Sequence, residues 1–325
     1  MLHLLITVGD VAGIGPEIIV KAWPTLTSFC VPVVVGSPAW MAKTVSGLGS
    51  TSQVREISRI RDARGEAGVI ECYDPVGVDL SGVEVGTITE AGGRAAYEYL
   101  CTAIDSVLIG EADGIVTAPL HKEGLHLAGV RHPGHTEILA ERTGTGEFAM
   151  VLWGDGLAVA HVTLHMALRD VFRHITTPAI VEKIRLLDGL LTRLLDRRPR
   201  IAVAALNPHG SDGGLFGSEE ATIIAPAVAL GRAEGIEVSG PFPTDTLFVR
   251  AGRGEFDGIV AMYHDAGHIA MKLRCGSRAV NISAGLPIVR TSVAHGTAYD
   301  IAGRGIADPG SLIEAARVAC KLCDR

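Results

Sequence analysis

The feature that most constrains this fold is the repeated alternation of short, wholly apolar runs with longer amphipathic segments. The runs are rich in valine and isoleucine, which is typical of strands in a sheet covered on both faces. Strands are predicted at 4–8, 31–35, 114–117, 158–162, 201–205, 258–262 and 279–282. Helices are predicted between them, at 91–108, 136–143, 179–193, 218–233 and 311–322. This order predicts an α/β fold with doubly wound sheets.

Length and composition narrow the class of protein. The chain has 325 residues, which suffices for two domains of ordinary size or one large α/β unit. A formal net charge of −7 argues against a broad nucleic-acid-binding surface. No apolar stretch reaches the roughly 18 to 20 residues of a membrane span, and the first residues lack the basic region of a signal peptide. We therefore expect a cytoplasmic protein with free thiols and no membrane or nucleic-acid partner.

The stretch "ITVGDVAGIGPEI" (6–18) passes from a strand through glycines into a helix, as many nucleotide-binding proteins do. Its glycines, Gly9, Gly13 and Gly15, give the spacing G-x-x-x-G-x-G. A dinucleotide-binding turn needs G-x-G-x-x-G and an acidic residue about twenty positions later. Here the next strand ends at Val35-Gly36 without an acid. The stretch therefore predicts a strand–turn–helix entry, not a pyrophosphate-binding loop.

Histidines provide the first candidate site. His165, His209 and His264 each follow a predicted strand, where α/β sheets collect functional groups. Three imidazoles can bind a divalent cation and leave positions open for a substrate. Their separations of 44 and 55 residues form no local metal signature, so three ordinary strand-end histidines are an alternative. His161 could also share a face with His165 on a strand.

A basic and polar set provides the second candidate site. Lys272, Arg274, Arg278, Asn281 and Arg290 lie within 19 residues and suit a phosphate or a carboxylate. A solvated face is the alternative, although Arg290 ends an apolar stretch. Two glycine-rich segments accompany this set, 206–220 and 295–309. The first could bind an anion at a helix N-terminus or form only a tight turn.

Several ordered motifs together resemble the 4-hydroxythreonine-4-phosphate dehydrogenase (PdxA) family. They are "GDVAGIGPE", "PGHTE", "LNPHGSDGG", "TDTLF", "AMYHDAGH", "VNISAGLPIVRTSVAHGTA" and "AGRGIAD", and they span nearly the whole chain. The resemblance implies two α/β/α domains around a cleft, related to isocitrate and isopropylmalate dehydrogenases. It also implies a homodimer with its active site at the subunit interface. We expect a cofactor-side domain at 1–130 plus 270–325, and a second domain at 131–269 with the metal ligands and the dimer interface.

The resemblance also implies the roles of individual residues. It assigns His165, His209 and His264 to one divalent metal ion, which could be Zn²⁺, Mg²⁺, Co²⁺ or Mn²⁺. The substrate contacts that it implies are His135, Thr136, Lys272, Asn281 and Arg290. The segment 295–309 is similar to the adenosine-binding loop of isopropylmalate dehydrogenases. That similarity implies contacts to NAD, or to NADP, from His295, Gly296, Thr297, Ala298 and Asp300.

The activity implied is oxidation of the 3-hydroxyl of a 4-phosphorylated 3-hydroxy acid, followed by loss of CO₂, in pyridoxal phosphate biosynthesis. The general base stays open among Asp245, Asp265 and Lys272. "APLHKEGLH", "PGHTEILAE" and "HDAGHIAMKL" look closer to a branch that oxidises 4-phospho-D-threonate or 4-phospho-D-erythronate in sugar-acid breakdown. A further relative oxidises aromatic cis-dihydrodiol carboxylates. A non-catalytic ligand-binding protein is the remaining alternative, although it would not need a Lewis acid.

Overall fold

The chain forms two compact α/β units in a computed structural model that describes residues 1–132 and 134–324. Unit 1 combines both ends of the chain, Met1–Gly146 and Leu286–Arg325, whereas unit 2 is continuous, Glu147–Gly285. The sequence placed the domain boundaries after residues 130 and 269. Both positions lie earlier in the chain than the boundaries of the two units, which follow residues 146 and 285. The mixed α/β architecture expected from the alternation of apolar and amphipathic segments is confirmed.

Unit 1 contains a parallel sheet whose strands follow the order β3-β4-β2-β1-β5-β12. These strands are β1 (His3–Thr7), β2 (Val31–Val35), β3 (Gln53–Glu56), β4 (Val69–Tyr73), β5 (Gly114–Thr117) and β12 (Val289–Val293). Its α-helices are α1 (Gly15–Leu26), α2 (Pro38–Gly47), α3 (Glu90–Leu108), α4 (Lys122–Leu127), α5 (His135–Thr143) and α11 (Gly310–Cys323).

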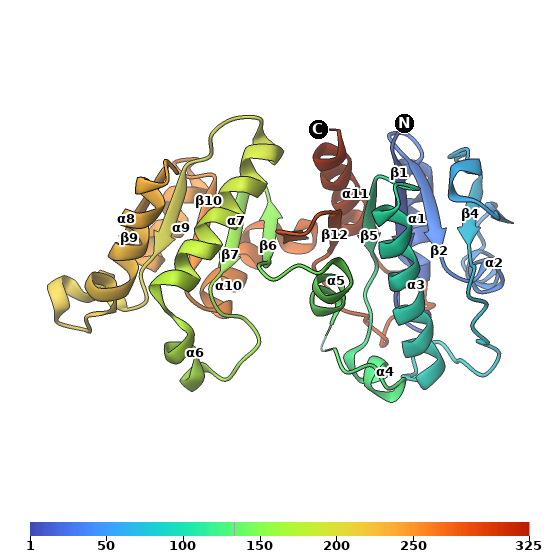
Figure 1. The fold of residues 1–325 in the computed structure, drawn as a ribbon. Helices are drawn as coiled ribbons and strands as arrows, with labels where there is room; N and C mark the ends of the chain where they lie inside the picture. The colour runs from blue at the N-terminus through green and yellow to red at the C-terminus, as the bar shows by residue number, and fades with distance from the viewer. Residues whose placement is uncertain (133, 325) are drawn as a thin grey trace. The chain divides into compact units, whose positions relative to one another are not determined.

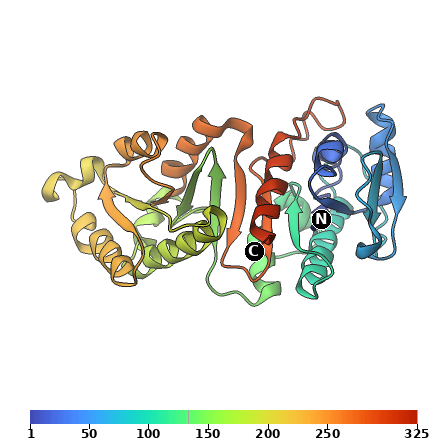
Figure 2. The same ribbon diagram turned by 90° about the horizontal axis from the view of Figure 1, so that it is seen from above.

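Helices cover both faces of this sheet, which explains the wholly apolar strands. Helix α3 packs on β1 and β5 and contacts α4, while α1 and α11 pack against each other on the other face (Figures 1 and 2). In β1 the side chains of Leu4, Leu5 and Ile6 are all fully buried, although successive residues point to opposite faces. The carboxyl ends of β1, β5 and β12 therefore bring together the loops that follow them.

Unit 2 contains a mixed sheet in the order β11-β6-β7-β10-β8-β9, antiparallel from β11 to β7 and parallel from β7 to β9. Its strands are β6 (Ala149–Gly154), β7 (Leu157–His161), β8 (Ile201–Ala204), β9 (Val238–Phe242), β10 (Gly258–Ala261) and β11 (Val280–Ala284). Its α-helices are α6 (Leu168–His174), α7 (Thr177–Leu195), α8 (Ala225–Ala233), α9 (Thr244–Gly252) and α10 (His264–Cys275). Helix α7 lies over β7 and β10 and contacts α8, and α10 also contacts β6 and β7 (Figure 1).

One strand was not predicted from the sequence, and one predicted helix needs correction. The polar segment 46–66 contains strand β3 and a short 3₁₀ turn at Ile60–Asp62. Strand β3 pairs with β4 at the edge of the sheet, where solvent keeps its side chains polar. The single helix expected at 218–233 is a π-helical turn, Glu220–Ile224, followed by α8. A π-turn is frequent near functional sites, and this one lies behind the loop that carries His209.

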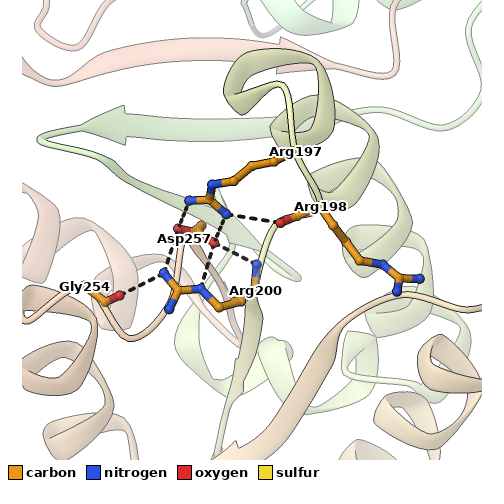
Figure 3. Close-up of polar contacts among 5 residues, drawn as sticks. All are labelled: Arg197, Arg198, Arg200, Gly254 and Asp257. Carbon is orange, nitrogen blue, oxygen red and sulfur yellow. Dashed lines mark hydrogen bonds and ion pairs between the residues drawn. The ribbon is translucent and has the colours of Figure 1, made fainter.

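Asp257 anchors the end of α7 to the start of β10 within unit 2 (Figure 3). Arg197 donates two hydrogen bonds to its carboxylate, at 2.9 and 2.7 Å, and the backbone N–H of Arg200 donates a third, at 2.8 Å. Burial opposes ionisation of Asp257, but these bonds outweigh burial and lower the pKa of its carboxyl. The cluster holds a strand end of the sheet and contains none of the expected site residues.

The helices in the described part of the chain were compared with the length and apolar character that a membrane span requires. None of the helices there is both long enough and apolar enough to cross a bilayer.

Candidate active site

Unit 2 contains a cavity of about 290 Å³ at the carboxyl end of β7 and the start of α10. The loop after β7 and the first turn of α10 supply the residues that line it, namely Leu164, His165, Met166, Leu168, Val171, Tyr263, His264 and Asp265. The rings of His165 and His264 stand 5.8 Å apart between their centroids. The structure thus brings two of the expected metal ligands and one candidate base, Asp265, to one cavity.

A carboxylate orients His264 at the N-terminus of α10. Its Nδ1 lies 2.7 Å from Oδ1 of Asp265. Because an ionised carboxylate only accepts hydrogen bonds, Nδ1 carries the proton and Nε2 keeps its lone pair. Histidine ligands of metal ions commonly have such a carboxylate on the second ring nitrogen. His264 can therefore coordinate a cation through the lone pair of Nε2.

His209 lies in a loop of unusual backbone conformation after β8. Five successive residues, 209 to 213, have φ between +44° and +73°, and three of them are not glycine. Such conformations cost free energy and gather at functional sites. The side chain of His209 is 68% exposed, and its Nδ1 lies 3.1 Å from Oδ2 of Asp212. His209 thus repeats the pairing of His264 with a carboxylate.

Glu220 fixes the base of this loop. Its carboxylate accepts hydrogen bonds from the backbone N–H groups of Leu206 and Asn207, at 2.8 and 2.7 Å, and from the hydroxyl of Ser211. Burial opposes ionisation of Glu220, but these bonds lower the pKa of its carboxyl to about 2. The glycine-rich segment 206–220 therefore closes around a carboxylate of its own, which argues for the tight turn and against an anion site.

The three expected metal ligands are not gathered within one chain. Across residues 1–132 and 134–324, no group of three or more His, Cys, Asp or Glu side chains is placed to hold a metal ion. The expected face shared by His161 and His165 is also not formed, because β7 ends at His161 and His165 lies in the following loop. The metal assignment to His165, His209 and His264 stays a prediction.

A second histidine pair, which the sequence reasoning did not single out, stands behind His264. The ring of His268 stacks on that of His264 at 3.7 Å and 11°, and its Nδ1 lies 3.2 Å from Nε2 of His161. Burial, aided by neighbouring histidines, lowers the pKa of His161 to about 3 and that of His268 to about 4. The spacing of four residues between His264 and His268 could have predicted that the two rings share one face of a helix. The contact between His268 and His161 could not be predicted from the sequence, because the two residues are far apart in it.

The remaining expected residues of unit 2 lie on three elements. Lys272 is exposed two turns along α10 from His264, and Asp245 is exposed in the first turn of α9. Asn281 lies in β11, where its Oδ1 is buried without a hydrogen-bond partner. A buried amide oxygen without a partner costs free energy unless a ligand or water satisfies it.

Unit 1 contains three of the expected substrate residues, namely Arg290 in β12 and His135 and Thr136 at the start of α5. Arg290 is only 2% exposed and donates a hydrogen bond of 2.7 Å to the hydroxyl of Thr117. Burial lowers its pKa to about 9, against the opposing effect of Glu137. His135 begins α5, beside Thr136, and burial with the charge of Arg290 lowers its pKa well below the usual range. Pro133 of the "PGHTE" motif lies outside the described residues.

The expected cofactor loop, 295–300, packs against the glycine-containing stretch 6–18 near the N-terminus, which is called the signature stretch below. The backbone N–H of Ile14 donates to the carbonyl of Thr297 at 2.9 Å, and a Cβ on Gly13 would meet that same oxygen at 2.8 Å. Ala298 has a left-handed φ of 44°. The hydroxyl of Tyr299 donates to Asp10 at 2.7 Å. The glycines of the signature thus allow close backbone approach to this loop.

Glu17 and Lys21 of α1 form a clamp on residues 305–307, a role that the sequence did not reveal. Glu17 accepts hydrogen bonds from the backbone of Gly305 and Ala307, at 3.2 and 2.8 Å, and Lys21 donates to the carbonyls of the same two residues at 2.7 Å each. A cavity of about 190 Å³ adjoins the clamp. It is lined by Val11, Gly13, Pro16, Glu17, Trp40, Lys43, Thr44, Gly47, Leu48, Val85 and Gly303. The stretch that resembles a nucleotide loop is therefore a scaffold for the 295–307 segment.

Comparison with known proteins places this α/β chain among the dehydrogenases. The family model described as "Pyridoxal phosphate biosynthetic protein PdxA" matches residues 28–319. The chain belongs to the PdxA family, which confirms the resemblance seen in its motifs.

Individual relatives match almost end to end. The chain is 46% identical over 319 residues to 4-hydroxythreonine-4-phosphate dehydrogenase of Beijerinckia indica, covering 98% of this chain and 94% of that protein. It is 45% identical over 323 residues to D-threonate 4-phosphate dehydrogenase of Cupriavidus necator, covering 98% and 97%. The crystal structure of 4-hydroxythreonine-4-phosphate dehydrogenase from Klebsiella pneumoniae aligns with a TM-score of 0.90 at 41% identity, over 99% of this chain and 100% of that one. Similarity therefore confirms a dehydrogenase, and it fits both substrate branches.

Proposed function

We propose that the protein oxidises the 3-hydroxyl of a 4-phosphorylated 3-hydroxy acid with NAD and releases CO₂ from the resulting β-keto acid. Membership of the PdxA family supplies the class of reaction. The observation that carries the proposal is the cavity of unit 2, where His165 and His264 face a common space beside Asp265. The product would serve pyridoxal phosphate biosynthesis, or the breakdown of a sugar acid if the substrate is D-threonate 4-phosphate.

The donor set in unit 2 fits a divalent cation. His264 and His209 each have Nδ1 paired with a carboxylate, which leaves Nε2 for coordination. Three neutral imidazoles suit Zn²⁺, Co²⁺ or Mn²⁺, and Mg²⁺ less well because it prefers oxygen ligands. We assign His165, His209 and His264 to this ion. When bound, it would supply Lewis acidity for the ionisation of the hydroxyl and for the decarboxylation that follows.

The chain's own groups then bind the acid and move its proton. Asp265 lines the cavity, whereas Asp245 and Lys272 do not, so we assign the hydroxyl proton to Asp265. Lys272 and Asn281 would hold the polar groups of the substrate from unit 2, since Asn281 has an unsatisfied amide oxygen. In unit 1, the buried cation of Arg290 with His135 and Thr136 suits a phosphate or carboxylate.

NAD would accept the hydride, and we assign its binding to unit 1. The loop His295–Asp300 is held in one conformation by contacts with Ile14 and Asp10. The cavity of about 190 Å³ beside Gly303 has an indole, Trp40, on one wall, which suits a flat adenine ring. NADP stays an alternative, because Lys43 lines the same cavity and could meet an additional phosphate. We also propose a cytoplasmic enzyme, in keeping with its free cysteines.

A second copy of the chain would complete the metal site. His209 is exposed, and no group of three ligands forms within the described part of one chain. Exposed apolar side chains accompany each ligand-bearing segment, namely Leu168 and Phe172 on α6, Leu215 and Phe216 after His209, and Ile269 and Leu273 on α10. Apolar surface of this extent on the segments of a site is typical of an interface. We therefore propose a homodimer whose active sites are shared.

Substituting the ligands tests both the metal and the sharing. His209→Ala and His264→Ala should each lose the bound ion and lower turnover about a thousandfold, because Lewis acidity is worth several kcal/mol. Metal content and NADH absorbance at 340 nm measure the two effects. His126→Ala on α4, an exposed histidine of unit 1, should change neither.

Mixing the two inactive variants then distinguishes the arrangements. If the sites are shared, mixed dimers recover activity, because one of their two sites has a full ligand set. If each site is built by one chain, mixing recovers nothing and the shared site is wrong. A wild-type protein that forms no NADH with any phosphorylated hydroxy acid would instead favour the non-catalytic ligand-binding protein.

A further inference from the structure

The ring of Tyr299 stands at the centre of the expected cofactor loop and contacts a residue of a different element. Its centroid lies 5.2 Å from that of the His121 ring, and the two planes are inclined by 28°, so the rings are stacked. His121 follows the carboxyl end of β5 and directly precedes α4. Ala298 and Asp300, the neighbours of Tyr299 in the chain, are both proposed cofactor contacts. The stack therefore joins the β5–α4 connection to the loop that is assigned to NAD.

Backbone contacts fix the position of the β5–α4 connection, and with it the position of His121. The carbonyl oxygen of Pro119 accepts a hydrogen bond of 2.9 Å from the N–H of Asp10, in the signature stretch. Beyond His121, α4 lies directly on α3, since a Cβ on Gly93 would come within 1.9 Å of the carbonyl oxygen of Gly124. The connection is thus held on both sides of His121, which presents its ring from a rigid base.

The loop needs such support, because its backbone is strained beside Tyr299. Ala298 has a φ of 44°, in the left-handed region, which costs free energy for a residue with a side chain and persists only where neighbours hold it. The hydroxyl of Tyr299 donates a hydrogen bond of 2.7 Å to the buried Asp10. That bond fixes the end of the side chain but lets the ring turn about its long axis, whereas a stacked ring fixes the plane. The two contacts together restrict Tyr299 to one orientation.

Packing, and not hydrogen bonding, is what His121 contributes to this contact. Its Nδ1 is buried and has no hydrogen-bond partner among the described residues, and its side chain does not cap α4. A buried polar atom without a partner costs free energy, so that nitrogen does not hold the imidazole in place. The contact with Tyr299 consequently depends on a flat ring at position 121 and not on a particular nitrogen.

We propose that His121 is a positioning residue for the cofactor, because its ring holds Tyr299, and through Tyr299 the loop 295–300, in the conformation that binds NAD. His121 acts through the loop and does not touch the reacting atoms. The inference rests on the proposed function for the identity of the cofactor. It gives a role to the first histidine of "APLHKEGLH", a motif that had only indicated a branch of the family.

Substitution of the ring tests the stack. His121→Ala should raise the Kd for NAD about tenfold, measured by calorimetry without substrate, because an aromatic pair contributes up to about that factor. The kcat at saturating NAD should stay unchanged, since no reacting group is removed. His121→Phe keeps a flat ring and should bind NAD within about twofold of the wild type. His126→Ala, at an exposed histidine of α4, is the matched control.

A second readout needs no cofactor. Arg304 is exposed just after the loop, so trypsin can cleave after it when the loop opens. His121→Ala should raise the rate of this cleavage several-fold in the absence of NAD, whereas His121→Phe should not. In a Tyr299→Leu background, which has already lost the stack, His121→Ala should change neither the cleavage rate nor the Kd further.

Three results would overturn the inference. They are an unchanged Kd and cleavage rate in His121→Ala, a His121→Phe variant as impaired as His121→Ala, and a full effect of His121→Ala in the Tyr299→Leu background. A wild-type protein that binds no NAD would instead refute the cofactor assignment of the proposed function. Cleavage of the protein without cofactor would still decide whether His121 holds the loop.

Discussion

Two glycine-rich turns of this protein, 9–17 in unit 1 and 207–217 in unit 2, look alike in sequence and differ in what they present. In the first, Asp10 and Glu17 are fully or almost fully buried and accept hydrogen bonds from the 299–307 segment. In the second, a buried acid, Glu220, lies beneath the turn, while His209 points outward and is 68% exposed. Both turns depend on buried carboxylates, but only the second projects a candidate ligand.

The difference teaches how to interpret glycine in such segments. In the first turn, Gly9 and Gly13 have no room for a Cβ, since the carbonyl oxygens of Pro119 and Thr297 would lie 2.1 and 2.8 Å away. In the second turn, a Cβ on Gly213 or Gly214 would meet no atom within 4 Å, but both residues have positive φ. Glycine therefore serves close packing at Gly13 and backbone shape at Gly213 and Gly214, whereas Gly9 and Gly217 combine a positive φ with close contacts. The first turn is a scaffold, and the second displays a side chain.

Removal of the Glu17 carboxylate from the scaffold turn should give the largest loss of stability among the substitutions considered. Glu17→Ala leaves the N–H groups of Gly305 and Ala307 without their acceptor and Lys21 without its counter-ion. We expect the free energy of unfolding to fall by about 3 kcal/mol, as for other buried hydrogen-bonded carboxylates. Urea denaturation measures the loss, with Glu111→Ala, an exposed glutamate, as the control. An equally small effect of both substitutions would contradict the scaffold role.

Glu220 should give the second largest effect, and one that depends on pH. Its folded-state pKa of about 2 lies below the unfolded value of about 4.3, so its contribution is full above about pH 4.3 and is lost as the pH falls towards 2. Glu220→Gln should therefore destabilise by about 2 kcal/mol at pH 7 and by less at pH 3. Denaturation at both pH values measures this, with Glu111→Gln at an exposed glutamate as the control. A loss that is the same at both pH values would exclude the ionised carboxylate as the cause.

Substitution of Tyr299 should give the smallest loss of stability. It also tests whether the scaffold turn affects cofactor binding. Tyr299→Phe removes one hydrogen bond to Asp10, whose pKa burial already raises. We expect about 1 kcal/mol of destabilisation and a KM for NAD raised a few-fold at unchanged kcat. Tyr73→Phe on β4 is the control. An unchanged KM would separate the scaffold turn from cofactor binding.

The sequence predicted the interior strands well because burial on both faces leaves a simple pattern. The runs at 31–35 and 114–117 coincide with β2 and β5. Strand β3 was missed because it is polar at the sheet edge, and only its pairing with β4 makes it a strand. Strand β7 was predicted at 158–162, but its hairpin partner β6 was missed, although Asp155-Gly156, with positive φ at both residues, is a recognised turn signal.

The candidate site was predictable only in part, for a related reason. Strand ends and family motifs located His165, His209 and His264 in the chain, and the structure places the first and third on one cavity. The partners of those residues depend on contacts far apart in sequence. His161 meets His268 across 107 residues, and Asp10 meets Tyr299 across 289. Such contacts follow from the tertiary fold and leave no local pattern.

The pairing of Ala149 with Ala284 has a consequence for how the polypeptide is made. Those residues stand opposite each other on β6 and β11, so unit 2 leaves and re-enters the rest of the chain at one place. During synthesis, unit 2 has emerged in full before β12 and α11, which unit 1 needs for its sheet and for one of its helical faces. We expect unit 2, the central segment, to fold first on the ribosome. Unit 1, the outer segment, should complete its sheet only after the chain is released. A gene for the central segment alone should therefore yield a soluble product, whereas one that stops at residue 285 should leave the outer segment open to proteases.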